Sequence, residues 1–159
     1  MTKLSHFDAS GQAHMVDIAH KEETKRTAIA IGSISMSAEA FKLLEFNASR
    51  KGDVLGIARI AAIQGTKMTA TMIPLCHPLS LSHVHVEFYK DESALSVQIE
   101  VTAETVGKTG VEMEALTGAS AGLLTIYDML KAVDKRMVIQ DIHLVKKQGG
   151  KSGEFTFSE

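Results

Sequence analysis

Two side chains that could transfer protons, Asp128 and Lys131, follow a long uncharged segment of the chain. The thirteen residues 115–127 carry no charge and are mostly small. If this segment is a helix, it is buried on most sides, and Asp128 and Lys131 lie three residues apart on one face. Charges at the end of a buried helix are costly unless they are paired or used in chemistry. The pattern indicates either an acid–base pair in a site or, more simply, a surface ion pair where the helix reaches solvent.

Two carboxylates, Glu112 and Glu114, lie in the first turn of the same predicted helix. The helix dipole favours acidic side chains there, so they need no further role. Glu114 nevertheless falls on nearly the same face as Asp128 and Lys131, although the helical rise separates Glu114 from Asp128 by roughly 21 Å. The two ends cannot act on one bond of a small substrate from one helix. Either one end is functional, or the substrate is long, or neighbouring subunits bring opposite ends together.

A third group of reactive side chains lies in the segment IPLCHPL (73–79), which holds the only cysteine of the chain. Its two prolines restrict the backbone around Cys76 and His77. A rigid loop that presents an imidazole suits ligand binding or proton transfer. The segment is a weak metal site, because no second Cys-x-x-Cys or His-x-x-x-His accompanies it. Taken alone, His77 is more often structural than catalytic.

Two glycine–lysine turns, Gly107-Lys108-Thr109 and Gly150-Lys151-Ser152, suggest a triphosphate-binding loop. A P-loop needs a glycine five residues earlier, where this chain has Thr102 and Val145. The chain is therefore not a P-loop protein. Each turn can still offer backbone N–H groups and a lysine to a phosphate, or can be a plain turn.

The composition is that of a globular protein without special bulk properties. The 159 residues are 45% hydrophobic and 23% charged, with a net charge of -2. This charge argues against general binding of nucleic acid or acidic membranes. A single cysteine, the lack of a membrane-length apolar run and a polar N-terminus predict a cytoplasmic protein.

Hydrophobic periodicity divides the chain into an arm, residues 1–25, and a single domain, residues 26–159, with a flexible C-terminal tail. Period-two alternation predicts strands at 26–36, 84–90, 94–106 and 138–147, and helical spacing predicts helices at 37–46, 54–72 and 111–133. We expect Gly32 to mark a bulge. The core-facing side chains of the third strand are predicted to be Leu95, Val97, Ile99, Val101 and Ala103.

This order of elements is the split β-α-β pattern of a ferredoxin-like α+β sandwich, with a four-stranded antiparallel sheet and one extra helix. Helices on one face leave the other face of the sheet in need of cover. The usual solution is an oligomer.

Spaced motifs along the chain resemble the cyclic pyranopterin monophosphate synthase (MoaC) family of molybdenum cofactor biosynthesis. They are GQAHMVD (11–17), KGDV (51–54), IPLCHPL (73–79), GKTGVEMEALT (107–117), TIYDMLKAV (125–133) and GGKSG (149–153). The resemblance covers essentially the whole chain. The difference that we note is Gly118 and Gly122 in the long helix, where alanines would be expected.

The resemblance implies a homohexamer, a trimer of dimers, with active sites at subunit interfaces. It implies a lyase that converts (8S)-3′,8-cyclo-7,8-dihydroguanosine 5′-triphosphate to cyclic pyranopterin monophosphate and pyrophosphate. A radical S-adenosylmethionine partner would make this substrate from GTP. The implied catalytic residues are Asp128, Lys51 and Lys131, and the implied substrate contacts are Leu75, Cys76, His77, Met113 and Glu114.

The residue types suit such a reaction. A partly buried lysine with a lowered pKa can serve as acid or base, while Asp128 orients or relays. Glu112 and Glu114 can accept hydrogen bonds from the amino and imino groups of the base. Lys51, and Lys147 or Lys151 from a neighbour, would stabilise the phosphate charge. We expect no resident cofactor or metal, and Mg²⁺ only as a companion of the triphosphate.

Two other classes fit the same residues. One is a non-catalytic nucleotide-sensing module, since ferredoxin-like folds often bind ligands at interfaces without reacting. The other is an oligomeric structural protein whose charges are solvated surface. Release of pyrophosphate and pterin from the cyclised nucleotide separates the enzyme from both.

Overall fold

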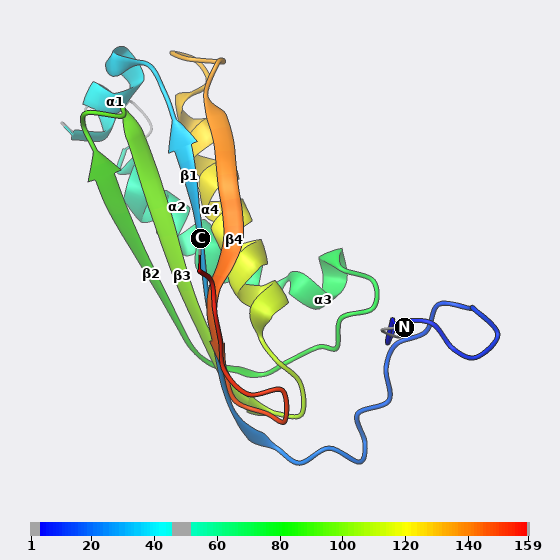
Figure 1. Cartoon of the computed structure of the whole chain (residues 1–159). Coiled ribbons are helices and arrows are strands. Elements are labelled where there is room, and N and C mark those ends of the chain that lie inside the picture. Colours follow the sequence, from blue (N-terminus) through cyan, green and yellow to red (C-terminus); the bar gives the residue numbers. More distant parts are fainter. Residues whose placement is uncertain (1–3, 46–51, 159) are drawn as a thin grey trace.

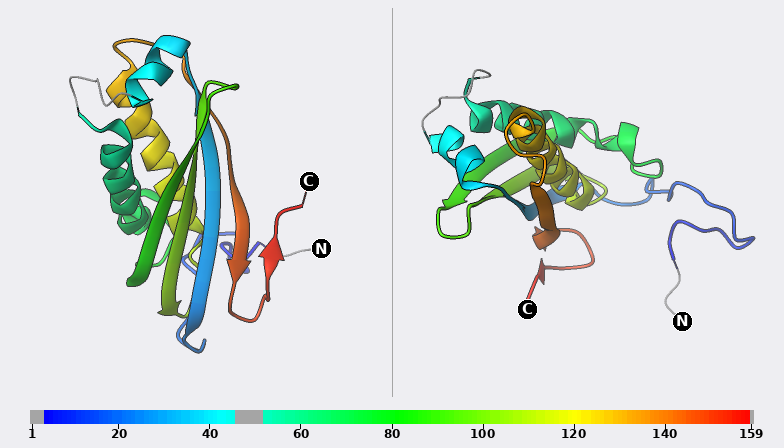
Figure 2. Two further views of the ribbon diagram at one scale, coloured as in Figure 1. Left: turned by 90° about the vertical axis from the view of Figure 1, so that its left-hand side faces the viewer. Right: turned by 90° about the horizontal axis from the view of Figure 1, so that it is seen from above.

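An antiparallel sheet in the order β2-β3-β1-β4-β5 forms one layer of the computed structural model, which describes residues 4–45 and 52–158. The strands are β1 (Thr24–Ser35), β2 (Leu81–Asp91), β3 (Ser96–Gly107), β4 (Val138–Gln148) and β5 (Phe155–Thr156). The helices are α1 (Ala38–Glu45), α2 (Val54–Lys67), α3 (Thr69–Met72) and α4 (Glu112–Leu130). The helices gather on one face of the sheet, and its opposite face carries none in the described part (Figures 1 and 2). The ferredoxin-like α+β class is confirmed.

The core lies between this sheet and α2 and α4, and alternation along the strands fills it. Val97, Ile99, Val101 and Ala103 of β3 are fully buried, as predicted. Each valine or isoleucine buried in this way contributes about 1.5–3 kcal/mol to folding. On β1 the buried positions are mainly small residues, Ala28, Ala30 and Gly32, together with Ile34. Small side chains there let α4 pack close to the centre of the sheet.

Small residues also set the close packing of α4 against α2. A Cβ atom at Gly118 would lie 2.7 Å from Cγ2 of Thr66 and 3.1 Å from the carbonyl oxygen of Ala62. A Cβ atom at Gly122 would overlap the side chain of Ile99, and one at Gly65 would lie 2.6 Å from the Cβ of Ala121. The expectation of alanines at 118 and 122 therefore does not suit this helix pair, because the glycines provide the room in which the helices meet.

We expect Gly118→Val to lower the free energy of unfolding by about 1–3 kcal/mol, because the added isopropyl group must displace Thr66 or the α2 backbone. Urea denaturation measures the change. Gln64→Ala on α2 is the control, since the Gln64 side chain is exposed and little packing is lost. An unfolding free energy unchanged by Gly118→Val would contradict this account of the helix pair.

The long predicted helix 54–72 divides in two at Met68. The amide of Met68 donates to the carbonyls of Gln64 and Gly65, which ends α2, and α3 begins at the next residue. The hydroxyl of Thr69 bonds to the Thr66 carbonyl at 3.0 Å. Such hydroxyl-to-backbone bonds compete with the helical ladder. The prediction of one continuous helix was wrong at this point.

Three details of the strands refine the prediction. Gly32 lies at a shift of register between β1 and β4, so the predicted bulge is confirmed. Leu95 does not lie in β3, because it has a φ of 48° and belongs to the hairpin turn. The two-residue strand β5 was not predicted; its residue Phe155 pairs with Lys147 of β4.

The two ends of α4 lie in different surroundings. Its first turn lies beside the loop between α3 and β2, while its last turn leads to β4 at the far end of the sheet (Figure 1). Within the described residues, no helix is long and apolar enough to cross a membrane.

Candidate active site

A cavity of about 260 Å³ lies where three segments meet: the N-terminal arm (residues 4–23), the loop between α3 and β2, and the first turn of α4. The side chains that the sequence predicted to contact a substrate all line it, although two distant segments supply them. They are Leu75, Cys76, His77, Glu112, Met113 and Glu114. We call this space the carboxylate cavity.

The loop between α3 and β2 presents Cys76 and His77 to the carboxylate cavity. Ile73 leaves α3 in an extended conformation, and the amide of Cys76 donates a hydrogen bond of 3.1 Å to its carbonyl, which closes a turn at Pro74. Nε2 of His77 lies 2.7 Å from the carbonyl oxygen of Val16. Because a carbonyl oxygen only accepts, this nitrogen carries the proton. His77 thus joins the loop to the N-terminal arm.

Glu112, the first residue of α4, forms an ion pair with Lys147 of β4. Both side chains are about three-quarters buried, so water screens the pair less than one on the surface. A Cβ atom at residue 110 would overlap the Glu112 carboxylate, and Gly110 therefore gives this side chain its space. The pair fixes the first turn of α4 against the sheet at the edge of the cavity.

Glu114 is the buried carboxyl of the cavity, with an exposed fraction of 4%. Burial raises the pKa of Glu114 from its usual 4.5 to about 7, and the negative charge of Glu112 adds to the rise. A hydrogen bond from backbone N–H opposes it. A carboxyl with a pKa near neutrality can donate or accept a proton at neutral pH. Glu114 is thus chemically suited to proton transfer.

Burial also raises the pKa of the Cys76 thiol, and the charges of Glu114 and Glu112 raise it further. Because the thiolate is the reactive form, Cys76 is a poor nucleophile at neutral pH. We expect iodoacetamide to alkylate the folded protein roughly tenfold more slowly than it alkylates glutathione at the same pH. Mass spectrometry follows the reaction. Alkylation as fast as that of glutathione would contradict a neutral, shielded thiol.

A second cavity, of about 590 Å³, is lined by Lys21, Arg26 and Lys151 together with Glu22. We call it the cation cavity. Thr24 also lines it, and the hydroxyl of Thr24 is buried without a hydrogen-bond partner in the described part of the chain. Three cations beside one carboxylate favour an anionic ligand. Lys21 lines both cavities, which places the two side by side.

Two backbone features hold Arg26 at the wall of the cation cavity. Its Nε donates a hydrogen bond of 3.2 Å to the carbonyl of Gly107. Gly150 has a φ of 78°, and a Cβ atom there would overlap the guanidinium of Arg26. Glycine at position 150 is therefore explained by local structure: it adopts the positive φ of the turn and lets the guanidinium approach the backbone.

The lysines at the end of β4 have different partners. Lys147 is paired with Glu112, and Lys146 lies 3.1 Å from Glu154. Lys151 lines the cation cavity. Of the two lysines predicted to reach a phosphate, Lys151 is therefore available to an anion in this chain, whereas Lys147 is engaged by a carboxylate.

Asp128 and Lys131 lie at the other end of α4, outside both cavities. Nζ of Lys131 donates to Oδ1 of Asp128 at 2.6 Å, and the two side chains are 52% and 62% exposed. Within one chain Asp128 and Lys131 therefore form a surface ion pair, which was the simpler of the two interpretations of their spacing in the sequence. In the single chain the hydrogen bond to Asp128 raises the pKa of Lys131, whereas a lysine that serves as acid or base was expected to be partly buried with a lowered pKa. Lys51, the third predicted catalytic residue, lies outside the described residues.

Sequence reasoning missed the contribution of the N-terminal arm. Its residues Ser5, His6, Val16, Ile18 and Lys21 line the carboxylate cavity. The available signal was the motif GQAHMVD, which was noted without a role. No cluster of three or more His, Cys, Asp or Glu side chains within residues 4–45 and 52–158 is arranged to hold a metal ion.

One comparison with known proteins bears on this chain. A family model described as the MoaC family matches residues 15–150, which is most of the chain. The matched range includes both cavities except for parts of the arm and the last glycine–lysine turn.

Proposed function

Because this chain belongs to the MoaC family and thus to molybdenum cofactor biosynthesis, we propose that it is a cyclic pyranopterin monophosphate synthase. The substrate would be (8S)-3′,8-cyclo-7,8-dihydroguanosine 5′-triphosphate, and the products cyclic pyranopterin monophosphate and pyrophosphate. The observation that carries the proposal is the adjacency of a carboxylate cavity and a cation cavity, because a nucleotide needs both. In this proposal the base enters the first and the triphosphate the second.

The carboxylate cavity suits the guanine-derived ring. Glu112 and Glu114 can accept hydrogen bonds from its amino and imino groups. The ring must open and close again as a pterin, and these steps require proton transfers. Glu114, whose pKa is about 7, can hold or release a proton there at neutral pH.

The cation cavity suits the phosphates. To close the cyclic monophosphate, a ribose oxygen attacks the α-phosphorus, and the bond from that phosphorus to the bridging oxygen of pyrophosphate breaks. The hydroxyl proton passes to a base, and the leaving pyrophosphate carries away the bonding electrons and gains negative charge. Lys21, Arg26 and Lys151, which line this cavity, would stabilise that charge. If Mg²⁺ accompanies the substrate, we expect it on the phosphate oxygens.

We propose that Asp128 and Lys131 act on a substrate held by another copy of the chain. The carboxylate cavity and this pair lie at opposite ends of α4, about 20 Å apart along the helix. Packing against a second copy would bury Lys131 and lower its pKa, toward the value that proton transfer at neutral pH requires. Lys51 would complete the same set of groups.

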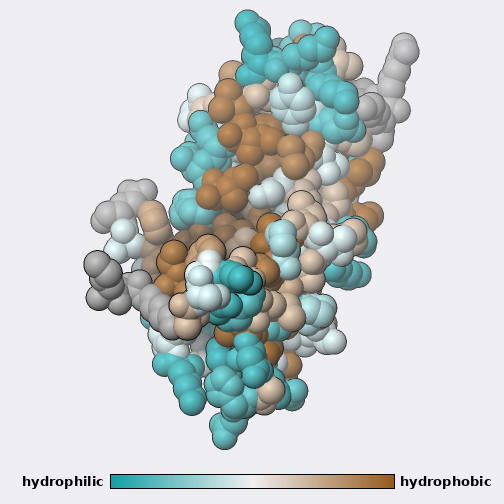
Figure 3. Space-filling view, turned by 90° about the vertical axis from the view of Figure 1, so that its right-hand side faces the viewer, coloured by the Kyte–Doolittle hydropathy of each residue, from teal (hydrophilic) through white to brown (hydrophobic). Residues whose placement is uncertain are grey.

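An apolar surface on one side of the molecule supports such assembly. Brown side chains gather on the face shown in Figure 3, the side on which α4 and β4 lie. Exposed apolar residues of these elements include Leu124, Val138 and Ile142. Together with the helix-free face of the sheet, this surface offers what the proposed homohexamer needs.

The test of the function is turnover by the purified full-length protein. We expect it to release one pyrophosphate for each pterin formed from the cyclised guanosine triphosphate, and to release none from GTP. Nucleotide binding without either product would refute the enzyme and favour a sensing module.

A further inference from the structure

The N-terminal arm lies along the carboxylate cavity as an extended segment. His14, Val16 and Ile18 are half-buried, while Met15 and Asp17 between them are exposed. This alternation is that of a strand with one face against the protein. The side chains of Val16 and Ile18 line the cavity. The arm therefore forms one of its walls.

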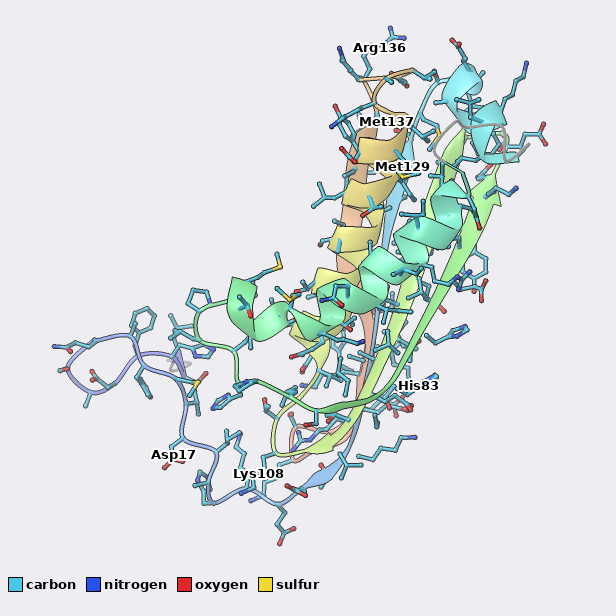
Figure 4. The ribbon with its side chains drawn as sticks, turned by 180° about the vertical axis from the view of Figure 1, so that it is seen from behind. Asp17, His83, Lys108, Met129, Arg136 and Met137 are labelled. Atoms are coloured by element: carbon cyan, nitrogen blue, oxygen red, sulfur yellow. The ribbon has the colours of Figure 1, made fainter. Side chains whose placement is uncertain are left out.

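Within the described residues, two side chains supply the hydrogen bonds that tie this wall to the rest of the chain. Nε2–H of His77 donates to the carbonyl oxygen of Val16 at 2.7 Å, and Nζ of Lys108 donates to that of Ala19 at 2.9 Å. The backbone bonds of the arm close within the arm itself, such as His14 to His6 at 3.0 Å. Figure 4 shows the arm, with Asp17 labelled, passing beside Lys108.

We propose that His77 is a positioning residue, which with Lys108 fastens the arm as the wall of the carboxylate cavity. The N–H group at Nε2 donates its hydrogen bond to the Val16 carbonyl and is therefore not available to the substrate. His77 thus holds the arm through Nε2, and the direct substrate contact that the resemblance implies is left to Nδ1, because His77 also lines the cavity. This inference deepens the proposed function and rests on it.

The fastened arm has a consequence for the substrate. Two residues beyond Ala19, Lys21 lines both cavities. Fixing the carbonyls of Val16 and Ala19 therefore also fixes the start of the segment that carries this cation. Release of the arm would open the wall of the carboxylate cavity and displace Lys21 from the phosphates, so substrate binding would suffer more than the chemical steps.

The test compares His77→Leu, His77→Gln and Lys108→Met in the full-length chain. A glutamine amide can still donate near the position of Nε2, whereas leucine cannot. We expect His77→Leu and Lys108→Met each to raise hydrogen exchange about five- to tenfold, the population change that loss of one hydrogen bond brings. The change is expected at those amides of residues 14–21 that donate hydrogen bonds, namely those of His14, Ala19 and Lys21. His77→Gln should restore most of the protection.

Steady-state kinetics complete the test. His77→Leu and Lys108→Met should raise KM for the cyclised nucleotide by similar factors with a smaller change in kcat. Lys90→Met, an exposed lysine of β2, is the control for loss of a surface charge. If His77→Leu raises KM while Lys108→Met does not, or if neither raises exchange in the arm, His77 does not act through the arm. The exchange experiment needs no substrate, so its result stands apart from that of the turnover assay.

Discussion

Lys131→Met and Asp128→Asn are each expected to lower turnover of the cyclised nucleotide by a factor of about 10²–10⁴, the contribution of a positioned acid or base. The pair is joined at 2.6 Å, and both side chains are more than half exposed in the single chain. Neither is part of the core. Their loss should therefore leave the urea midpoint unchanged while kcat falls.

Lys135→Met provides the matched control for this prediction. Lys135 is an exposed lysine in the turn that follows α4, and its side chain has no place in the proposed site. It should keep the kcat of the unaltered protein. Normal turnover by Lys131→Met would show that the exposed ion pair at the end of α4 is only a surface feature.

Glu114→Gln is expected to change how stability depends on pH. The pKa of Glu114 is raised from 4.5 to about 7 in the folded chain, so the folded state binds the proton more tightly than the unfolded state. The protonated Glu114 contributes to the free energy of unfolding. This contribution is fully present below pH 4.5 and is lost as the pH rises through 7. The loss amounts to up to about 3 kcal/mol of unfolding free energy, since one pKa unit corresponds to about 1.4 kcal/mol.

The measurement is urea denaturation across this pH range. Glutamine carries no charge at any of these values, so Glu114→Gln should be more stable than the unaltered protein above pH 7 and should lack this part of the pH dependence. The control is Glu92→Gln in the exposed β2–β3 turn, which should leave the profile unchanged. Parallel profiles for the unaltered protein and Glu114→Gln would mean that Glu114 has an ordinary pKa.

The same substitution should reduce turnover, because a glutamine amide cannot exchange a proton with the substrate. If stability responds as expected but turnover does not, Glu114 is a buried carboxyl without a part in proton transfer.

The regular parts of the fold could be predicted because their patterns are local. Alternation along β3 marked Val97, Ile99 and Val101 as core residues, and all three are fully buried. The break at Met68 depends on an amide that is shared between the carbonyls of Gln64 and Gly65, and hydrophobic periodicity carries no information about such a shared bond. The need for glycine at 118 and 122 depends on α2 and on Ile99 of β3, and no local pattern contains the distance to either.

The candidate site, like the fold, has a part that the sequence predicted and a part that it did not. The motifs around Cys76 and Glu114 predicted residues that do line one cavity. The part played by the arm was missed, because Val16 contributes a backbone carbonyl as well as a side chain, and any residue has such a carbonyl. In the single chain Lys131 lacks the partial burial expected of a lysine that serves as acid or base, because its burial depends on what packs against the end of α4. That question concerns how copies of the chain assemble: the sequence predicts an oligomer but not which surface covers this end of α4.

The central proposal is that one active site combines the carboxylate cavity of one copy with Asp128 and Lys131 of another. Co-assembly of Glu114→Gln with Lys131→Met tests it directly, since each homogeneous variant should be nearly inactive. In a random equal mixture, a site that draws its two parts from different copies is intact in about a quarter of cases, so about a quarter of full turnover should return. Mixed assemblies as inactive as the separate variants would place both parts in one copy and contradict the proposal.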